Sequence, residues 1–442
     1  MQSLYSLILN RLRNTYWILP AAIVIAAILL AIQITWIDSL LNLSPDGRLG
    51  WLIQNNPEGA RAVLSTIAGS MITVAGVMLS STIVVLTLAS QQFGPRLVRN
   101  FIKDRPSQIV VGAFTGCFIY NILILKNIRS GDSDFVPQIA LIFGVLQAIL
   151  CIGLMIYFIQ HISTTIQVQS IMDRVKCELD LSIERLYPKA ENREPSISTE
   201  NPKPESSEPS PSTRKVGAQR AGYIQAIRYD ALLERCEQHN ATIRIHAIPG
   251  SFVIEDEPIF SISGQDEPGK DTLSELRSFF IIGTFPTSEQ DILFPIQQLE
   301  EMAIRALSPG INDPRTAIEC VDHLTASLSI LAKRPPPTEW VKDRHQKPRI
   351  HKASQPFDYI LREAFQQIHH HGCTDIQVVL RILKVLHKLL HIEGIQPDYK
   401  APIQSLIDEL YEKSIDCIQH SCDREKLSRF YSEIRPHNET NA

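Results

Sequence analysis

Residues 62–89 read AVLSTIAGSMITVAGVMLSSTIVVLTLA and contain no Asp, Glu, Lys or Arg. A helix that crosses a lipid bilayer needs about 20 consecutive apolar residues, so this stretch is long enough to span one. Three further uncharged stretches pass the same test, at residues 16–37, 108–125 and 137–159. The sequence therefore predicts an α-helical membrane protein, with four transmembrane helices in residues 1–160 and the lipid bilayer as their surroundings.

The second span carries small and hydroxyl-bearing residues along one face. They recur at steps of three and four, interrupted by Ile83, and are Thr66, Gly69, Thr73, Gly76, Ser80, Thr87 and Ser90. Such a face can pack closely against another helix, because small residues let two backbones approach. It can also line a water-filled path, as polar residues do in pores. Both interpretations hold if copies of the helix meet at a symmetry axis, and we therefore expect a homo-oligomer.

Basic residues near the span ends predict the orientation. They are Arg11 and Arg13 before the first span, and Arg96, Arg99, Lys103 and Arg105 between the second and third spans. Because loops rich in Lys and Arg remain in the cytoplasm, we expect the N- and C-termini to be cytoplasmic. The eight scattered cysteines are typical of reduced cytosolic thiols rather than of a disulfide framework.

Residues 161–187 follow the last span and are predicted to form an amphipathic stalk helix that continues from it. Their apolar residues recur at steps of three or four between charged ones and are Val168, Ile171, Val175, Leu179, Ile183 and Leu186. This stripe can pack against the chain's own C-terminal part or against the same helix of another subunit. Residues 188–219 are rich in Pro, Ser and Glu, and such a composition predicts a disordered linker.

An ordered α+β domain is predicted after the linker. Strand-like runs at residues 223–227, 241–247 and 279–283, with a turn at Pro249-Gly250, indicate a small β-domain over residues 220–285. Their order is similar to that of a small barrel of the biotinyl- or lipoyl-carrier type, although no Lys stands at a hairpin tip. Residues 286–442 show helical periodicity, interrupted by a charged loop after residue 337, and indicate a helical cytosolic domain.

The turn between the first two of these helices reads RALSPGINDP over residues 305–314. Gly310 favours the end of one helix, Asp313 is a typical N-cap, and Pro314 suits the first helical position because its missing N–H would be unpaired there. We interpret as structural the residues Arg305, Ser308, Pro309, Gly310, Asn312, Asp313 and Pro314. A ligand site at Arg305 and Asp313 is the alternative.

This turn, followed by Thr316-Ala317, resembles the signature of an uncharacterised bacterial family of predicted membrane proteins with a domain of unknown function. Residues 91–96 (QQFGPR), residues 222–227 (GYIQAI) and Gln290-Asp291 are similar to the same family. The resemblance runs from the first span to about residue 390. It implies a bacterial inner-membrane protein with four spans and a cytosolic C-terminal domain, and it implies no reaction, ligand or catalytic residue.

The sequence contains no pattern that predicts a metal, cofactor or catalytic site. The adjacent histidines at 369–371 point in different directions on a helix, and Cys417, His420 and Cys422 do not match a common zinc spacing. Neither a Gly-rich phosphate loop nor a nucleophile elbow is present. We expect no enzyme activity, no metal and no cofactor.

Charge restricts the remaining functions. The net charge of -4 provides no basic surface for nucleic acid. Proton-coupled carriers keep an ionisable residue inside the membrane, and the four spans contain no Asp or Glu. We therefore expect either an oligomeric channel or pore gated by its cytosolic domain, or a membrane-anchored scaffold or regulatory protein without conduction. The permeant or bound species does not follow from the sequence.

Overall fold

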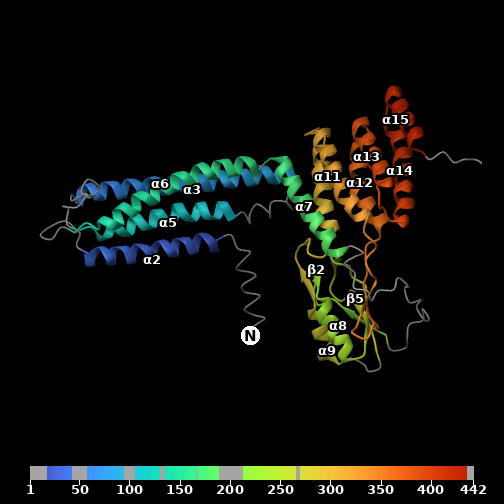
Figure 1. Ribbon diagram of the computed structural model, residues 1–442, viewed down its shortest axis with the longest axis horizontal. Helices are drawn as coiled ribbons and strands as arrows, with labels where there is room; N and C mark the ends of the chain where they lie inside the picture. The colour runs from blue at the N-terminus through green and yellow to red at the C-terminus, as the bar shows by residue number, and fades with distance from the viewer. Residues whose placement is uncertain are drawn as a thin grey trace, which may run out of the picture. The chain divides into compact units, whose positions relative to one another are not determined.

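The computed structural model of the protein describes residues 17–41, 57–93, 105–129, 135–165, 167–188, 213–264 and 269–435 (Figure 1). The chain divides into two compact units, Met1–Ile171 and Met172–Ala442. The first unit contains the long apolar helices, and the second contains strands and the remaining helices.

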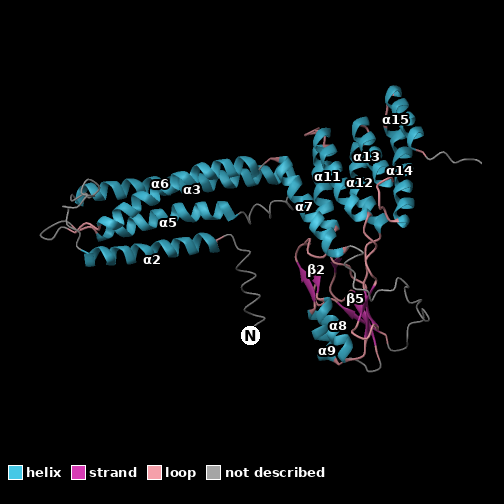
Figure 2. Ribbon diagram, in the orientation of Figure 1, coloured by secondary structure: helices cyan, strands magenta, loops and turns pink. Residues whose placement is uncertain are grey.

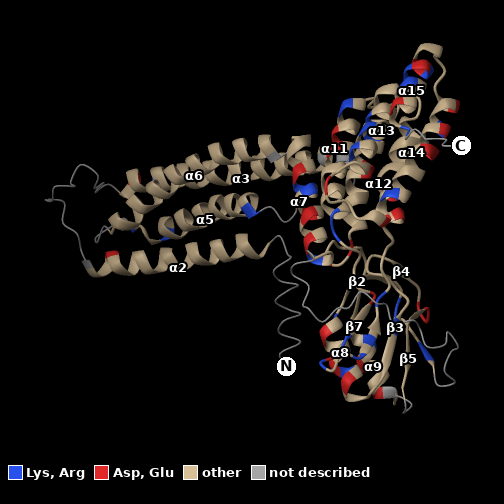
Figure 3. Ribbon diagram, turned by 45° about the vertical axis from the view of Figure 1, so that its right-hand side comes forward, with Lys and Arg blue, Asp and Glu red and all other residues tan. Residues whose placement is uncertain are grey.

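The described helices of the N-terminal unit are α2 (Ile18–Leu41), α3 (Pro57–Phe93), α5 (Arg105–Asn127) and α6 (Gln138–Thr165). Each contains a segment long and apolar enough to cross a membrane. In Figure 3 these helices carry few charged residues, whereas charged residues are frequent in the C-terminal unit. The prediction of four long apolar helices is confirmed, and the protein is a multi-pass membrane protein with four candidate spans.

Helix α5 packs against the other three helices of this unit. A Cβ atom added at Gly112 would lie 2.9 Å from the Cα of Pro20, and one added at Gly116 would lie 3.3 Å from the Cβ of Ala27. The spacing of these glycines is the small-xxx-small pattern that lets membrane helices approach closely. Helices α2 and α5 therefore contact each other through a glycine face that we did not predict.

The start of α6 is capped by a side chain from the end of α2. Asp38 is only 6% exposed, and its carboxylate accepts hydrogen bonds from the backbone N–H groups of Ile139 at 3.0 Å and Ala140 at 2.9 Å. Arg61 similarly donates to the carbonyl of Ile128, at 3.0 Å, just beyond the end of α5. These bonds satisfy backbone groups that a helix leaves unpaired at its ends.

Helix α7 (Val168–Leu186) is separate from α6, which ends at Thr165. The predicted stalk is therefore not continuous with the fourth span. The hydroxyl of Thr164 donates to the carbonyls of Gln160 and His161. Side-chain bonds of this kind compete with the helical backbone pattern and are common where helices bend or end.

The apolar stripe of α7 is buried inside the C-terminal unit. Met172 is fully buried, and its sulfur lies 3.4 Å from the sulfur of Cys320. Ser327 donates to a carboxylate oxygen of Asp180 at 2.5 Å. The stripe therefore packs against the chain's own C-terminal unit, which is one of the two alternatives that its sequence pattern allows.

The strands of the C-terminal unit form two sheets (Figure 2). The larger has the order β1 (Arg214–Gly217), β5 (Pro258–Ser263), β3 (Thr242–Ile245), β8 (Pro348–His351) and β7 (Trp340–Lys342). The smaller has the order β4 (Phe252–Val253), β2 (Gly222–Ile227) and β6 (Phe280–Gly283). Helices α8 (Tyr229–Gln238) and α9 (Lys270–Ser278) contribute Leu232 and Leu276 to the core shared with these strands.

The predicted small barrel is wrong, because both sheets are open. Strands β7 and β8 occupy the place of the expected charged loop, and β8 extends the larger sheet by pairing in parallel with β3. Parallel pairing joins segments that are distant in sequence, so the local strand pattern did not reveal it. Strand β1 falls within the stretch predicted as linker, and residues 189–212 of that stretch lie outside the described residues.

The remaining helices complete an α+β unit, as predicted. They are α10 (Leu293–Ala306), α11 (Pro314–Ala332), α12 (Phe357–Gly372), α13 (Ile376–Leu390), α14 (Pro397–Cys417) and α15 (Ser421–Ile434). Each has a face of buried apolar residues, and the faces of α10, α11, α12, α13 and α14 contact one another in neighbouring pairs. These contacts form the helical core of the unit.

Two polar residues join the strands to the helical region. The side-chain amide of Gln290 accepts a hydrogen bond from the N–H of Ile227 at 2.9 Å and donates to the carbonyl of the same residue at 3.0 Å. The carboxylate of Asp291 accepts a hydrogen bond from the N–H of Leu293 at 2.9 Å, at the start of α10. Burial raises the pKa of Asp291 to about 6, so at neutral pH this carboxylate is charged at an energetic cost.

We predict that Asp291→Asn stabilises the protein above pH 7. The raised pKa means that the folded state binds the proton of Asp291 more tightly than the unfolded state does. The free-energy cost of the buried charge is therefore absent below pH 4 and complete above pH 6 to 7. Asparagine keeps the acceptor and removes the charge, which corresponds to a gain of up to about 3 kcal/mol. Thermal unfolding at pH 5 and pH 8 should show a gain that grows with pH, and the exposed control Glu393→Gln should show none. Destabilisation by Asp291→Asn at both pH values would mean that the fold requires the charge.

Candidate functional site

The small-residue face of α3 points away from the other described helices of its unit. Its described members are all exposed and are Thr66, Gly69, Thr73, Gly76, Ser80 and Thr87; the side chain of Ser90 lies outside the described part. A Cβ atom added at Gly69 or Gly76 would meet no atom within 4 Å. The opposite face is the one that packs, through Leu64, Ala68 and Met71. The stripe therefore makes no contact with another described helix of the same subunit.

Three threonine hydroxyls of the stripe bond to their own helix. Thr66, Thr73 and Thr87 each donate to the carbonyl four residues earlier, at 2.7, 2.8 and 2.9 Å. A hydroxyl donor satisfied in this way can lie in lipid, in a helix interface or beside water at little cost. The stripe is thus a flat surface of low polarity that still exposes oxygen lone pairs.

Helix α3 is also longer than a bilayer requires. Its 37 residues correspond to about 55 Å at 1.5 Å per residue, against about 30 Å for the hydrocarbon layer. Exposed apolar residues flank the stripe, and they include Ile72, Val77, Ile83 and Val84. The outward face can therefore be covered by lipid, by a second subunit or by both.

The turn over residues 305–314 is a compact connection between α10 and α11. Ser308 donates its hydroxyl to the carbonyl of Arg305 at 2.6 Å, and Asp313 donates its backbone N–H to the carbonyl of Ala306 at 2.8 Å. Asn312 has φ +50, in the left-handed region. Pro309 and Gly310 form the exposed tip. Backbone and side-chain bonds therefore hold the turn without a ligand.

Asp313 is the N-cap of α11, with Pro314 as the first helical residue. One carboxylate oxygen accepts the hydroxyl of Thr316 at 2.6 Å, and the other accepts its backbone N–H at 3.2 Å. The bond from the Thr316 hydroxyl is the main cause that lowers the pKa of Asp313. Arg305 forms an ion pair with Glu301 at 3.2 Å. The two charged residues of the turn thus each bond to a neighbour on their own side.

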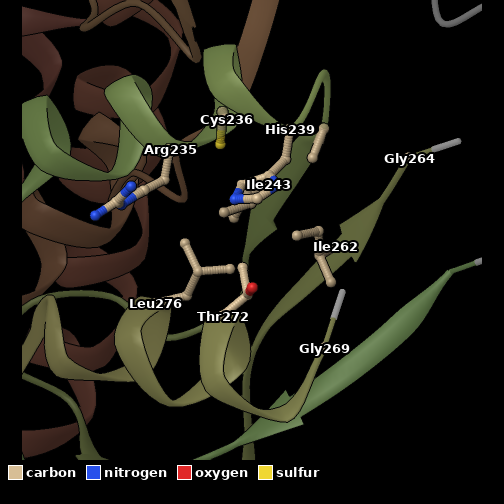
Figure 4. A pocket seen from close by; sticks show the side chains of 10 residues that line it. Arg235, Cys236, His239, Ile243, Ile262, Gly264, Gly269, Thr272 and Leu276 are labelled. Carbon is tan, nitrogen blue, oxygen red and sulfur yellow. The ribbon is translucent and has the colours of Figure 1, made fainter. Parts of the chain in front are cut away.

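A cavity of about 130 Å³ lies between α8, α9 and strands β3 and β5 (Figure 4). Cys236 lines it, but burial raises the pKa of this thiol to about 12, so the thiol stays protonated and is a poor nucleophile. Arg235 pairs with Glu275, with 2.9 Å between Nε and Oε1. Cys236 therefore does not make this cavity a nucleophilic centre, and its other walls mix apolar residues with Arg235, His239 and Thr272.

The histidines at residues 369–371 and the cysteine group that begins at Cys417 lie on the contacting helices α12 and α14, and Cys373, just after the histidines, is hydrogen-bonded to Cys417. Within the described ranges, no three His, Cys, Asp or Glu side chains are grouped so that they could hold a metal ion. His369 is buried, its Nε2 lies 2.6 Å from the hydroxyl of Ser414, and burial lowers its pKa to about 4. Its neutral ring thus contributes to the contact between α12 and α14.

Residues 13–388 match the protein family described as "Predicted membrane protein (DUF2254)". The chain belongs to this family. It is also similar to uncharacterised proteins of Mycobacterium tuberculosis and Mycobacterium bovis, each 29% identical over 415 residues that cover 90% of this chain and 76% of the relative. No solved structure matches the chain.

For the signature turn of this DUF2254 chain, we predict that Asp313→Ala destabilises the C-terminal unit by about 1 kcal/mol, because the N-cap is lost. Asp313→Asn should be nearly neutral, since asparagine caps almost as well. Chemical unfolding of the two variants measures the difference. Equal loss of function in both variants with unchanged stability would instead identify Asp313 as a functional carboxylate.

Proposed function

We propose that copies of the chain assemble in a bacterial inner membrane into an oligomeric channel whose pore is lined by α3. The orientation of the small-residue stripe is the observation that supports this proposal. Gly69 and Gly76 have open space in front of them, and the hydroxyls of Thr66, Thr73 and Thr87 are exposed on the same side. Subunits that meet through this face would place a row of oxygen atoms around a common axis.

A membrane-anchored scaffold without conduction is the second candidate. The intrahelical bonds of the three threonine hydroxyls support it, because donors that are already satisfied do not require water. In this case the glycines serve only to bring α3 helices together. The two candidates share the interface and differ in whether its centre is hydrated.

We propose that conduction is passive and that the chain catalyses no reaction. Asp38 lies at the end of a span, but both of its carboxylate oxygens already accept backbone N–H groups of α6. A carboxylate fixed as a helix cap is poorly suited to carry protons across a membrane. The control of conduction would come from the C-terminal unit, which holds α7 through Met172 and Asp180.

We also propose that both termini are cytoplasmic. The support is the basic residues Arg11, Arg13, Arg96, Arg99 and Lys103, which lie outside the described residues, and the positive-inside rule. A cysteine introduced at Asp132 should react with an impermeant reagent added outside the cell, and one introduced at Lys103 should not. The reverse labelling pattern would place the C-terminal unit outside the cytoplasm.

Cysteine accessibility along α3 tests the pore. In a chain with the exposed Cys177 and Cys422 changed to serine, single cysteines at positions 73, 80 and 87 should react with a small, membrane-impermeant thiol reagent. Cysteines at positions 72, 74 and 79 should react far more slowly. The physical reason is that a thiol must ionise to react, and ionisation is disfavoured in hydrocarbon or in a dry helix interface.

Substitution of a glycine in the small-residue stripe of α3 gives a second test of the same proposal. Gly76→Leu should block the pore, whereas Gly153→Leu is the matched control, because Gly153 on α6 also has open space in front of it. Uniform protection of the cysteines, together with dissociation of the Gly76→Leu oligomer, would reject the channel and leave the scaffold.

A further inference from the structure

The C-terminal unit contains a second cavity, of about 370 Å³, beside the residue that follows α7. Its walls come from the segment before β7, the segment between β8 and α12, the start of α12, the start of α14 and Tyr187. The volume lies within the range of small-molecule sites, roughly 300–1,000 Å³. The cavity is distinct from the membrane helix proposed to line the pore.

Aromatic side chains form one wall of this cavity. Phe357 and Tyr399 stack with their ring centroids 4.0 Å apart and their planes 10° from parallel, and each is only 7% exposed. The start of α14 is held at the end of α11 by a hydrogen bond from the N–H of Gln396 to the carbonyl of Ala332, at 2.9 Å. The aromatic wall is therefore fixed before any ligand binds.

A buried phenol faces this wall. Tyr187 is 5% exposed and lines the cavity. Its backbone is fixed, since its carbonyl accepts a hydrogen bond from Arg334 at 2.8 Å. A phenol hydroxyl can donate and accept hydrogen bonds, so a ligand in the cavity has a polar group of the wall within its reach.

Among the described residues that line the cavity, Glu339 is the one charged residue, and its side chain is 51% exposed. Its carboxylate lies 3.9 Å from Nε2 of His351, and the pKa of that histidine is lowered by its burial and by the charge of Arg244. The imidazole is therefore largely neutral at pH 7, and the negative charge of Glu339 is not compensated by it. The cavity thus presents a carboxylate and a phenol above an aromatic wall.

We propose that this cavity binds a protonated amine with an apolar body. The ammonium group donates hydrogen bonds to the carboxylate of Glu339 and to the hydroxyl oxygen of Tyr187, and the apolar body packs against Phe357 and Tyr399. Aromatic faces also attract cations. The site stands whether or not the protein conducts. It lies where α7 ends, so the ligand would contact the end of the segment that joins the C-terminal unit to the membrane helices.

Calorimetric titration of the full-length protein in detergent tests the proposal, with 2-phenylethylammonium as the probe and 2-phenylethanol as its neutral counterpart. We expect saturable binding of the amine with one site per chain, and binding of the alcohol at least about ten-fold weaker. Glu339→Gln should weaken amine binding about ten-fold or more, and Tyr187→Phe, which keeps the ring, by about three-fold or more, in line with the loss of hydrogen bonds to a charged group. Glu393→Gln, an exposed carboxylate elsewhere, should bind as the unmodified chain does.

The variants should melt at the same temperature as the unmodified chain, which separates loss of binding from loss of fold. Absence of saturable amine binding would overturn the proposal. Equal binding of the amine and the alcohol, unchanged by Glu339→Gln, would also overturn it, because the cavity would then be an apolar pocket without selectivity for a cation.

Discussion

The burial of helix α7 in the C-terminal unit is the interaction on which the rest of the account depends. Met172, Val175, Leu179 and Ile183 are fully buried, and burying an aliphatic side chain contributes about 1.5–3 kcal/mol. The bond between Ser327 and Asp180 adds a fixed polar contact. Because α7 is the segment through which the chain passes from α6 into this unit, any change in the unit that reaches the membrane by a covalent route passes through α7.

The membrane unit uses glycine in two different ways. The space in front of Gly112 and Gly116 is occupied by atoms of α2, so these glycines serve a helix contact within one subunit. Gly69 and Gly76 lie on a face of α3 that no described helix of the same subunit covers. An exposed face of small residues on an apolar helix gains little from lipid contact alone, whereas it allows close approach of another helix. This contrast is the reason for placing the subunit interface on α3.

Local patterns predicted the elements that depend on local chemistry. The apolar runs identified the four spans, and the step of three or four residues in α7 predicted its buried face. Asp313-Pro314 marked the start of α11 because capping involves only neighbouring residues. Long-range features were missed. The pairing of β8 with β3 and the capping of α6 by Asp38 both join segments about 100 residues apart, and no local periodicity encodes them.

The candidate sites could likewise be predicted from the sequence only in part. The composition of the α3 stripe was visible in the sequence, but its direction was not, since α3 is apolar on its other faces as well and either side could have packed on α5. The cavity at Tyr187 was not predicted at all. Its walls come from residues between 187 and 399 that share no motif, and only the fold brings Glu339 near Tyr187.

Single-channel recording of the purified protein in planar lipid bilayers tests the central claim most directly. The account predicts discrete conductance steps for the unmodified chain and for Gly153→Leu, and their loss in Gly76→Leu. A protein that assembles into stable oligomers in the same bilayers and yet shows no conductance would contradict the claim that α3 lines a pore.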